Sequence, residues 1–269
     1  MRFFLDLMSN PQTLRNIRID LSYDGSNYCG WQKQKGHPSV QETVEQAIQN
    51  ITREQVKLIG SGRTDAGVHA VCQTANFFTS STIPIDGLKK GINSLLPWDI
   101  ALLSVSEAPK WFHSRKSAKS KTYRYRIVTS PTRLPLIHRK AWCLSYPLDM
   151  EEMEKAAQLL LGEHDFSSLM ASGTSIKSTI RTITNIKIVK TSCPEYLPLQ
   201  IDEFRISVSA NGFLKYMVRN IAGLLKEIGA KRIPWHHTQR ILEARDRTKA
   251  PPTAPAWGLY LLEVSYPGY

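Results

Sequence analysis

The order of apolar patterns along residues 16–112 constrains the fold more than any other feature of the sequence. Residues 17–21 alternate apolar and polar side chains, as a half-buried strand does. The capping box Ser39-x-x-Glu42 opens a helix, and Pro84 opens a second one. Three further strands are predicted at residues 56–59, 71–78 and 100–105. The resulting β-α-β-β-α-β order is the ferredoxin-like, or split βαβ, pattern, whose sheet carries helices on one face.

Residues 113–269 show a similar order of patterns with more additions. Asp149-x-x-Glu152 caps a helix that ends at Gly162. Further helices are predicted at residues 214–228 and 238–244, and strands at 123–129, 180–189, 201–209 and 259–264. We therefore predict the α+β class, with two ferredoxin-like (RRM-like) α/β domains and mainly antiparallel sheets. The expected divisions are an N-terminal extension at 1–15, a first domain at 16–112 and a second at 113–269.

The predicted helix at residues 214–228 has two distinct faces. Its apolar residues form one stripe, which indicates a core-facing side. Lys215, Arg219 and Lys226 fall together on the opposite side at 100° per residue, beside the small residues Ala222 and Gly223. This pattern predicts a basic face that lets a bulky anionic partner approach closely.

Composition excludes several classes of protein. Hydrophobic residues make up 42% of the 269 residues, which is too many for a disordered chain. The longest apolar runs are about four residues, so no membrane span is expected. The apolar run at 3–5 is cut by Asp6, which argues against a signal peptide. The four cysteines are far apart and form no CxxC pair, which favours buried thiols in a reducing, cytoplasmic compartment over a zinc or disulfide framework.

The positive charge is concentrated in one segment. The formal net charge is +12, and residues 108–148 hold ten basic residues and no acidic one. The same segment also carries aromatic residues, among them Trp111, Phe112, Tyr123, Tyr125 and Trp142. A solvated surface is one interpretation of such a run. Basic side chains interleaved with aromatic ones also suit a polyanion with stackable bases, which favours nucleic acid as the partner.

The segment Gly60–Ala70, GSGRTDAGVHA, offers the clearest chemistry. A phosphate-binding glycine loop is one alternative, but the segment lacks a Gly-Lys-Ser/Thr ending and precedes a strand. A metal site built on Asp65 and His69 would need further ligands. A tight turn with a structural contact between Arg63 and Asp65 is the third alternative, and spacing alone does not decide among them.

Within this segment, GRTDAGVHA (Gly62–Ala70) resembles the active-site motif of TruA-type tRNA pseudouridine synthases. Other segments resemble family motifs in the same order along the chain: Tyr23–Gln32 (YDG…GWQ), Phe112–Arg115 with Lys121–Tyr125, Gly162–Phe166, Asn211–Asn220 and Ala254–Leu261. The resemblance covers roughly residues 16–267. Ser114 and Lys116 depart from the family pattern, which usually has alanine and an apolar residue there.

This resemblance implies an isomerase that converts uridine to pseudouridine at positions 38, 39 and 40 of the tRNA anticodon arm. It assigns the role of nucleophile to Asp65, in a cleft between the two domains. Arg219 would hold that carboxylate ionised, and Tyr123 would stack on the flipped-out uracil and help to remove the C5 proton. Such an isomerisation needs no cofactor, no metal and no nucleotide, and family members act as homodimers.

The resemblance and the charge pattern together predict the substrate-binding residues. Arg63 would fill the gap left by the flipped base or guide that base. Tyr123 would contact the uracil, and the remaining predicted contacts to tRNA are Arg115, Lys119, Lys121 and Arg124. An RNA-binding module that has lost catalysis is one alternative, against which the presence of Asp65, Tyr123 and Arg219 argues. A metal-dependent nuclease using Asp65 and His69 is another, and it predicts strand scission and inhibition by chelators.

Overall fold

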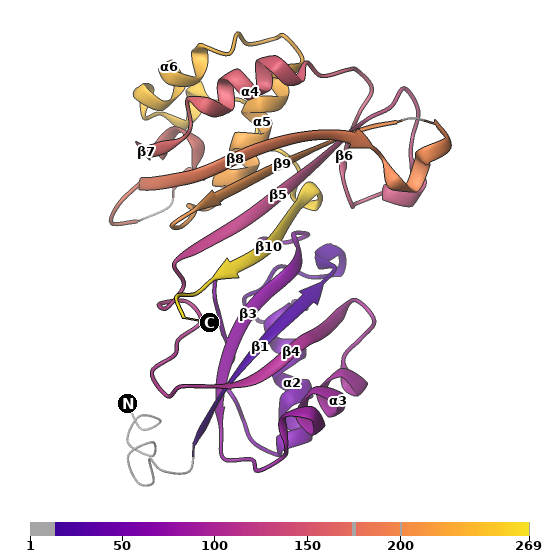
Figure 1. The fold of residues 1–269 in the computed structure, drawn as a ribbon, viewed down its shortest axis with the longest axis vertical. Helices are drawn as coiled ribbons and strands as arrows, with labels where there is room; N and C mark the ends of the chain where they lie inside the picture. The colour runs from indigo at the N-terminus through magenta and orange to yellow at the C-terminus, as the bar shows by residue number, and fades with distance from the viewer. Residues whose placement is uncertain (1–13, 174–175, 200, 269) are drawn as a thin grey trace. The chain divides into compact units, whose positions relative to one another are not determined.

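The computed structural model describes residues 14–268 apart from 174, 175 and 200 (Figure 1). The described chain divides into two compact units, one that runs up to Ala118 and includes Tyr266 and the residues after it, and one from Lys119 to Ser265. The predicted boundary near residue 112 falls earlier because the next residues still pack on the first unit. The Ser114 nitrogen, for example, donates to Asn76 Oδ1 of β3 at 2.9 Å. Residues 1–13 of the predicted extension lie outside the described residues.

The first unit has the predicted ferredoxin-like topology. Its strands and helices are β1 (Arg15–Tyr23), α2 (Val40–Thr52), β2 (Ile59–Gly60), β3 (His69–Thr79), α3 (Ile85–Leu95) and β4 (Ile100–Ala108). The strands stand in the order β4-β1-β3-β2, and each neighbouring pair is antiparallel. Both helices lie on one side of this sheet (Figure 1).

The second unit repeats this topology with additions. Its strands and helices are β5 (Ser120–Thr129), β6 (Trp142–Leu144), α4 (Met150–Gln158), β7 (Gly162–Asp165), β8 (Ile180–Ser192), β9 (Asp202–Ala210), α5 (Met217–Gly229), α6 (His237–Ala244) and β10 (Leu259–Ser265). The order β10-β5-β9-β8 matches β4-β1-β3-β2 of the first unit position for position, and these neighbours are antiparallel. β7 extends the sheet beyond β8, and β6 runs parallel to β5. The prediction of two ferredoxin-like units is therefore confirmed.

The helix starts follow the capping signals of the sequence. The Ser39 side chain accepts a hydrogen bond from the Glu42 backbone nitrogen at 3.4 Å, and the Asp149 side chain accepts one from Glu152 at 3.2 Å. Such caps stabilise a helix by about 1 kcal/mol each. The apolar stripe of α2 is fully buried at Val40, Val44 and Ile48. No helix in the described part of the chain is both long enough and apolar enough to cross a membrane.

Three predicted boundaries were wrong. β2 is shorter than the predicted strand at 56–59, because the backbone of Leu58 bonds to side chains of α2 instead of a neighbouring strand: Glu45 accepts from its nitrogen at 2.9 Å and Gln41 donates to its oxygen at 3.0 Å. α4 ends at Gln158 instead of running up to Gly162. α5 begins only at Met217, since Tyr216 before it has a left-handed backbone with φ of 65°.

The predicted basic face of the 214–228 helix was also wrong. Lys215 precedes the helix, and Lys226 is buried, paired with Glu227 and placed 5.0 Å from the centre of the Trp142 ring. The small residue Gly223 on this helix already packs against another segment of the same chain. A Cβ at Gly223 would collide with the carbonyl oxygen of Pro252, so the chain's own backbone occupies that face of α5.

Candidate active site

The loop that carries Asp65 connects β2 to β3 and is held at both ends. The Ser61 nitrogen donates to the Thr74 carbonyl oxygen at 2.8 Å, and Gln73 Nε2 donates to the Gly62 carbonyl oxygen at 2.9 Å. Within the loop, the Val68 nitrogen donates to the carbonyl oxygen of Asp65 at 3.1 Å. The backbone around Asp65 is thus a defined turn.

The segment from Tyr23 to Gln32 supports this loop from the side. The Trp31 nitrogen donates to the Thr64 carbonyl oxygen at 3.0 Å, and the Tyr23 hydroxyl lies 2.8 Å from Thr64 Oγ1. The Gly67 nitrogen donates to the Tyr28 carbonyl oxygen at 3.3 Å. Two motifs that are about forty residues apart in sequence therefore form one structure around Asp65.

Two glycines of that segment allow the close approach. A Cβ at Gly25 would collide with the Val68 carbonyl oxygen. A Cβ at Gly30 would lie 2.5 Å from the Thr64 carbonyl oxygen, and Gly30 has φ of +98°, a conformation that other residues rarely adopt. Any side chain at either position would displace the backbone on which Asp65 sits. Both motifs can be recognised in the sequence, but their contact with the Asp65 loop appears only in the structure.

Asp65 and Arg63 differ in their exposure. Asp65 is half-buried, whereas Arg63 is exposed and its Nε donates to Gln32 Oε1 at 3.1 Å. The two residues share one loop, which places a carboxylate and a guanidinium close together at the surface of the first unit.

His69, the other residue of the metal hypothesis, is buried in the first unit. Its Nδ1 lies 2.9 Å from Asp24 Oδ1 and 3.1 Å from the Gly25 nitrogen. In the neutral ring Nδ1 accepts from Gly25, and in the protonated ring it donates to Asp24. Among the described residues, three metal-type ligands gather only at Cys193, Glu195 and Glu203, which belong to the second unit. Asp65 and His69 are therefore not part of such a group of three.

Tyr123 lies on β5 of the second unit, on the side that faces the helices. It is 8% exposed and packs edge-to-face against Phe213, with ring centres 5.0 Å apart. Tyr125 follows on the same face and is fully buried, where its hydroxyl donates to the Pro255 carbonyl oxygen at 2.7 Å. Burial raises the pKa of Tyr125 well above its ordinary value. Tyr125 therefore has a structural contact for its hydroxyl, as the sequence analysis leads one to expect of a core tyrosine.

Arg219 lies in the first turn of α5 and is fixed by the segment before β10. Its Nε donates to the Ala254 carbonyl oxygen at 2.8 Å, and its own carbonyl oxygen accepts from the Ala254 nitrogen at 3.2 Å. Its guanidinium carbon lies 4.5 Å from the centre of the Tyr216 ring. These neutral contacts orient the guanidinium without neutralising its charge. Arg219 is also one of the groups that influence the pKa of Tyr125, so helix and strand meet here.

The predicted catalytic residues are thus divided between the two units. Asp65, with Arg63 and Arg115, belongs to the first unit. Tyr123 and Arg219 belong to the second, together with the three remaining predicted RNA contacts, Lys119, Lys121 and Arg124.

The predicted RNA contacts differ in their surroundings. Arg115 and Lys119 are exposed, and Lys121 and Arg124 are half-buried. Successive residues of a strand point to opposite faces, so Arg124 lies on the helix-free face of the second sheet while Tyr123 lies on the other. The Arg124 Nε donates to Ser207 Oγ at 3.4 Å. Among the described residues it joins no ion pair, and burial together with the nearby Arg205 lowers its pKa.

Comparison with known proteins adds a family to this geometry. A family model described as tRNA pseudouridine synthase matches residues 21–115 and 156–267, which include Asp65 and Arg219 but not Tyr123. The chain is 45% identical over 253 residues to tRNA pseudouridine synthase A of Thermoanaerobacter sp. (strain X514), which covers 94% of this chain and 100% of that protein. It is 43% identical, with the same coverage, to tRNA pseudouridine synthase A of Caldicellulosiruptor bescii. It is 42% identical to that of Nitrosomonas europaea, over 96% of this chain and 91% of that protein.

Proposed function

Since this chain belongs to the tRNA pseudouridine synthase family, we propose that it converts uridine to pseudouridine at positions 38, 39 and 40 of the tRNA anticodon arm. The enzyme is an isomerase. The reaction breaks the uridine N1–C1′ bond and joins C5 of the same base to C1′, while the C5 proton leaves and N1 gains a proton. The observation that carries the proposal is the 45% identity over 94% of the chain.

In this proposal Asp65 is the nucleophile. C1′ gains positive character as the N1–C1′ bond breaks, and a carboxylate suits that charge. The supported loop would keep the carboxylate in one place, which lowers the entropic cost of reaching a reactive geometry.

Arg219 and Tyr123 complete the proposed chemistry. A guanidinium beside Asp65 would keep its carboxylate ionised inside a site closed to water. The contacts of Arg219 with Ala254 support this role, since they hold the side chain in one orientation. The phenol of Tyr123 would stack on the uracil and assist removal of the C5 proton.

The target uridine must leave its stack before it reaches a carboxylate. We propose that Arg63 either fills the space vacated by that base or guides the base itself. The exposed position of Arg63 on the Asp65 loop supports this role. Arg115, Lys119, Lys121 and Arg124 would contact tRNA phosphates. A homodimer in the cytoplasm, with tRNA as its substrate, completes the proposal.

The test uses unmodified tRNA transcripts labelled with tritium at uridine C5. The wild type is expected to release tritium and to give carbodiimide-dependent reverse-transcription stops at positions 38, 39 and 40. Asp65→Asn and Asp65→Ala should lose tritium release by a factor on the order of 10³ or more, because no nucleophile remains. Their tRNA binding should persist. The matched control is Asp86→Asn, which changes an exposed carboxylate at the start of α3.

Each alternative has its own outcome. Tritium release by the Asp65→Ala variant would remove Asp65 from the reaction. Stops at other positions would contradict the proposed target. Wild-type binding without tritium release would favour a binding module, and RNA strand scission that a chelator stops would favour a nuclease.

A further inference from the structure

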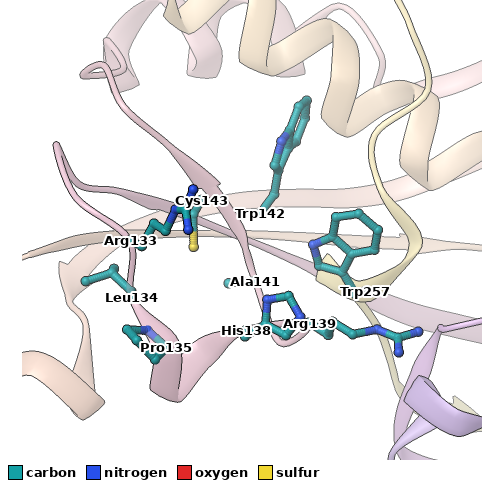
Figure 2. A pocket seen from close by; sticks show the side chains of 9 residues that line it. All are labelled: Arg133, Leu134, Pro135, His138, Arg139, Ala141, Trp142, Cys143 and Trp257. Carbon is teal, nitrogen blue, oxygen red and sulfur yellow. The ribbon is translucent and has the colours of Figure 1, made fainter.

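A pocket of about 890 Å³ lies in the second unit, outside the residues assigned to catalysis (Figure 2). It is formed by the chain between β5 and β6, by β6 itself and by one residue before β10. Its characteristic lining residues are Arg133, His138, Arg139, Ala141, Trp142 and Trp257. The lining includes neither Tyr123 nor Arg219. Pockets that bind small molecules typically have volumes of about 300–1,000 Å³.

The floor of this pocket is firmly packed. Leu134, Ile137 and Ala141 belong to a buried apolar cluster with Cys193 and Ile201. The connection turns tightly, with the Ile137 nitrogen donating to the Leu134 carbonyl oxygen at 3.3 Å. The Tyr260 hydroxyl of β10 donates to the Lys140 carbonyl oxygen at 2.7 Å. The pocket is therefore preformed, which lowers the cost of ordering it around a ligand.

The two tryptophans of the lining differ in their exposure. Trp142 is half-buried, packs edge-to-face with Tyr125 and lies 5.0 Å from Lys226 Nζ. Trp257 is 38% exposed. In Figure 2 its indole and the side chain of Arg133 stand on opposite sides of the opening, with Ala141 between them.

The charge of the lining is entirely of one sign. Arg133 and Arg139 are cationic, His138 becomes so when protonated, and no lining residue carries a carboxylate. Arg133 and His138 are exposed and take part in none of the ion pairs of the described residues. Both belong to the basic segment 108–148, so this pocket gives part of that charge a defined place.

We propose that this pocket binds one unpaired nucleotide of the RNA substrate, other than the target uridine, with its base stacked on Trp257 and its phosphate paired with Arg133. The inference rests on the proposed function, which makes RNA the substrate. An indole accepts any base by stacking, and a guanidinium pairs with phosphate through two hydrogen bonds. The uniformly positive lining suits the negative charge of a phosphodiester.

The test separates stacking from charge by using the full-length protein and unmodified tRNA. Binding is measured at several salt concentrations for Trp257→Leu, Trp257→Phe, Arg133→Gln and Arg133→Lys. Trp98→Leu removes a fully exposed tryptophan of the first unit, and Arg240→Gln removes an exposed arginine of α6, so these two variants are the matched controls. Thermal unfolding midpoints confirm that each variant is folded.

The two pocket residues should give different signatures. Trp257→Leu should weaken tRNA binding roughly 5- to 150-fold at every salt concentration, because losing a stacked base releases no counterion. Arg133→Gln should lower the slope of log affinity against log salt by about 0.7–0.9, the value of one phosphate contact. Trp257→Phe and Arg133→Lys should restore most of each effect. The controls should bind as the wild type does.

Several outcomes would overturn the proposal. Binding and salt slopes equal to those of the wild type in all four variants would remove RNA from the pocket. A changed sedimentation coefficient of the RNA-free Trp257→Leu protein, with unchanged tRNA affinity, would assign the pocket to a contact between two copies of the chain. Tritium release by the wild type on saturating tRNA is measured in parallel, so that failure of the pocket is distinguished from failure of the proposed function.

Discussion

At the scale of single residues, Glu203 shows that the basic segment also serves the fold. Its buried carboxylate accepts hydrogen bonds from Arg126 Nε at 2.7 Å and from Arg205 Nε at 2.9 Å. Burial alone would raise the pKa of Glu203, but hydrogen bonds from Arg205 and Arg126 and their positive charges lower it overall. Arg126 is thus committed to an internal partner, although it belongs to the segment whose charge suggests nucleic acid.

Replacing Glu203 should therefore destabilise the protein. We expect Glu203→Gln to lower the free energy of unfolding by about 3–5 kcal/mol, because two guanidinium groups lose their buried counterion. A lowered pKa means that the stabilisation is complete above the ordinary value of 4.5 and is lost as the pH falls through the folded-state pKa. Below about pH 4.5 the wild type should lose stability more steeply than the variant.

Denaturant unfolding between pH 3 and pH 8 checks both statements. Glu154→Gln is the matched control, since Glu154 is exposed and lies on α4 of the same unit. Equal stability of Glu203→Gln and the control at pH 7 would contradict the assigned role of the carboxylate.

At the scale of elements, the contact between α5 and residues 252–254 determines where Arg219 points. Gly223 allows the Pro252 carbonyl oxygen to approach the helix, and Ala254 holds Arg219 at both its Nε and its carbonyl oxygen. The glycine and the arginine are one turn of helix apart, so they share the same neighbouring segment.

Gly223→Ala should consequently reduce both stability and turnover. The added methyl group collides with backbone, which does not yield as a side chain does, and we expect a loss of about 1–3 kcal/mol. Because the shifted segment carries the anchor of Arg219, kcat for pseudouridine formation should fall more than KM rises. Steady-state kinetics and thermal unfolding provide the measurements.

The control for this substitution is Gly87→Ala in α3, where the new Cβ would meet side chains instead of backbone, Ile83 at 3.1 Å and Pro84 at 4.0 Å. Alanine is favoured over glycine within a helix by about 0.5–1 kcal/mol, so this variant should be neutral or slightly stabilised. A Gly223→Ala protein with wild-type kcat would show that the segment does not position Arg219.

Element types were predictable from the sequence because periodicity and caps are local signals. Ser39 and Asp149 mark helix starts that the structure confirms. The misplaced features depended on distant parts of the chain: α2 side chains take the backbone of Leu58, and Trp142 covers Lys226. A helical wheel identifies which residues share a face, but it does not reveal what the rest of the fold places against that face.

At the scale of the whole molecule, the net charge of +12 predicts a salt-dependent affinity for tRNA. Lys119→Glu with Lys121→Glu should weaken tRNA binding and lower the salt slope by about 1.4–1.8, if each lysine contacts one phosphate. Lys89→Glu with Lys90→Glu changes the net charge equally on α3 and is the control. Binding isotherms between about 50 and 200 mM salt compare the two double variants. Equal losses of tRNA affinity would show that only the net charge matters, and not the position of the two lysines.

The topology of each unit could be predicted because six patterned segments in one order leave few ways to form a sheet. The candidate site was identified through family resemblance more than through spacing, since Asp65 and Arg63 alone also fit a structural turn. The supporting roles of Gly25 and Gly30 needed coordinates, because nothing local in the sequence tells which distant backbone a glycine will contact.

The chain re-enters the first unit at Tyr266, directly after its last strand, and this has a consequence for synthesis. The Tyr266 hydroxyl donates to the Ser114 carbonyl oxygen at 2.6 Å, 152 positions earlier, and its ring packs on Phe112 and under Arg18. While the ribosome is still making the second unit, the first therefore lacks one of its buried aromatic side chains. A chain that ends before residue 266 would lack the Tyr266 side chain and would leave one side of the Phe112 ring uncovered. Exposed apolar surface of this kind is what chaperones and proteases bind.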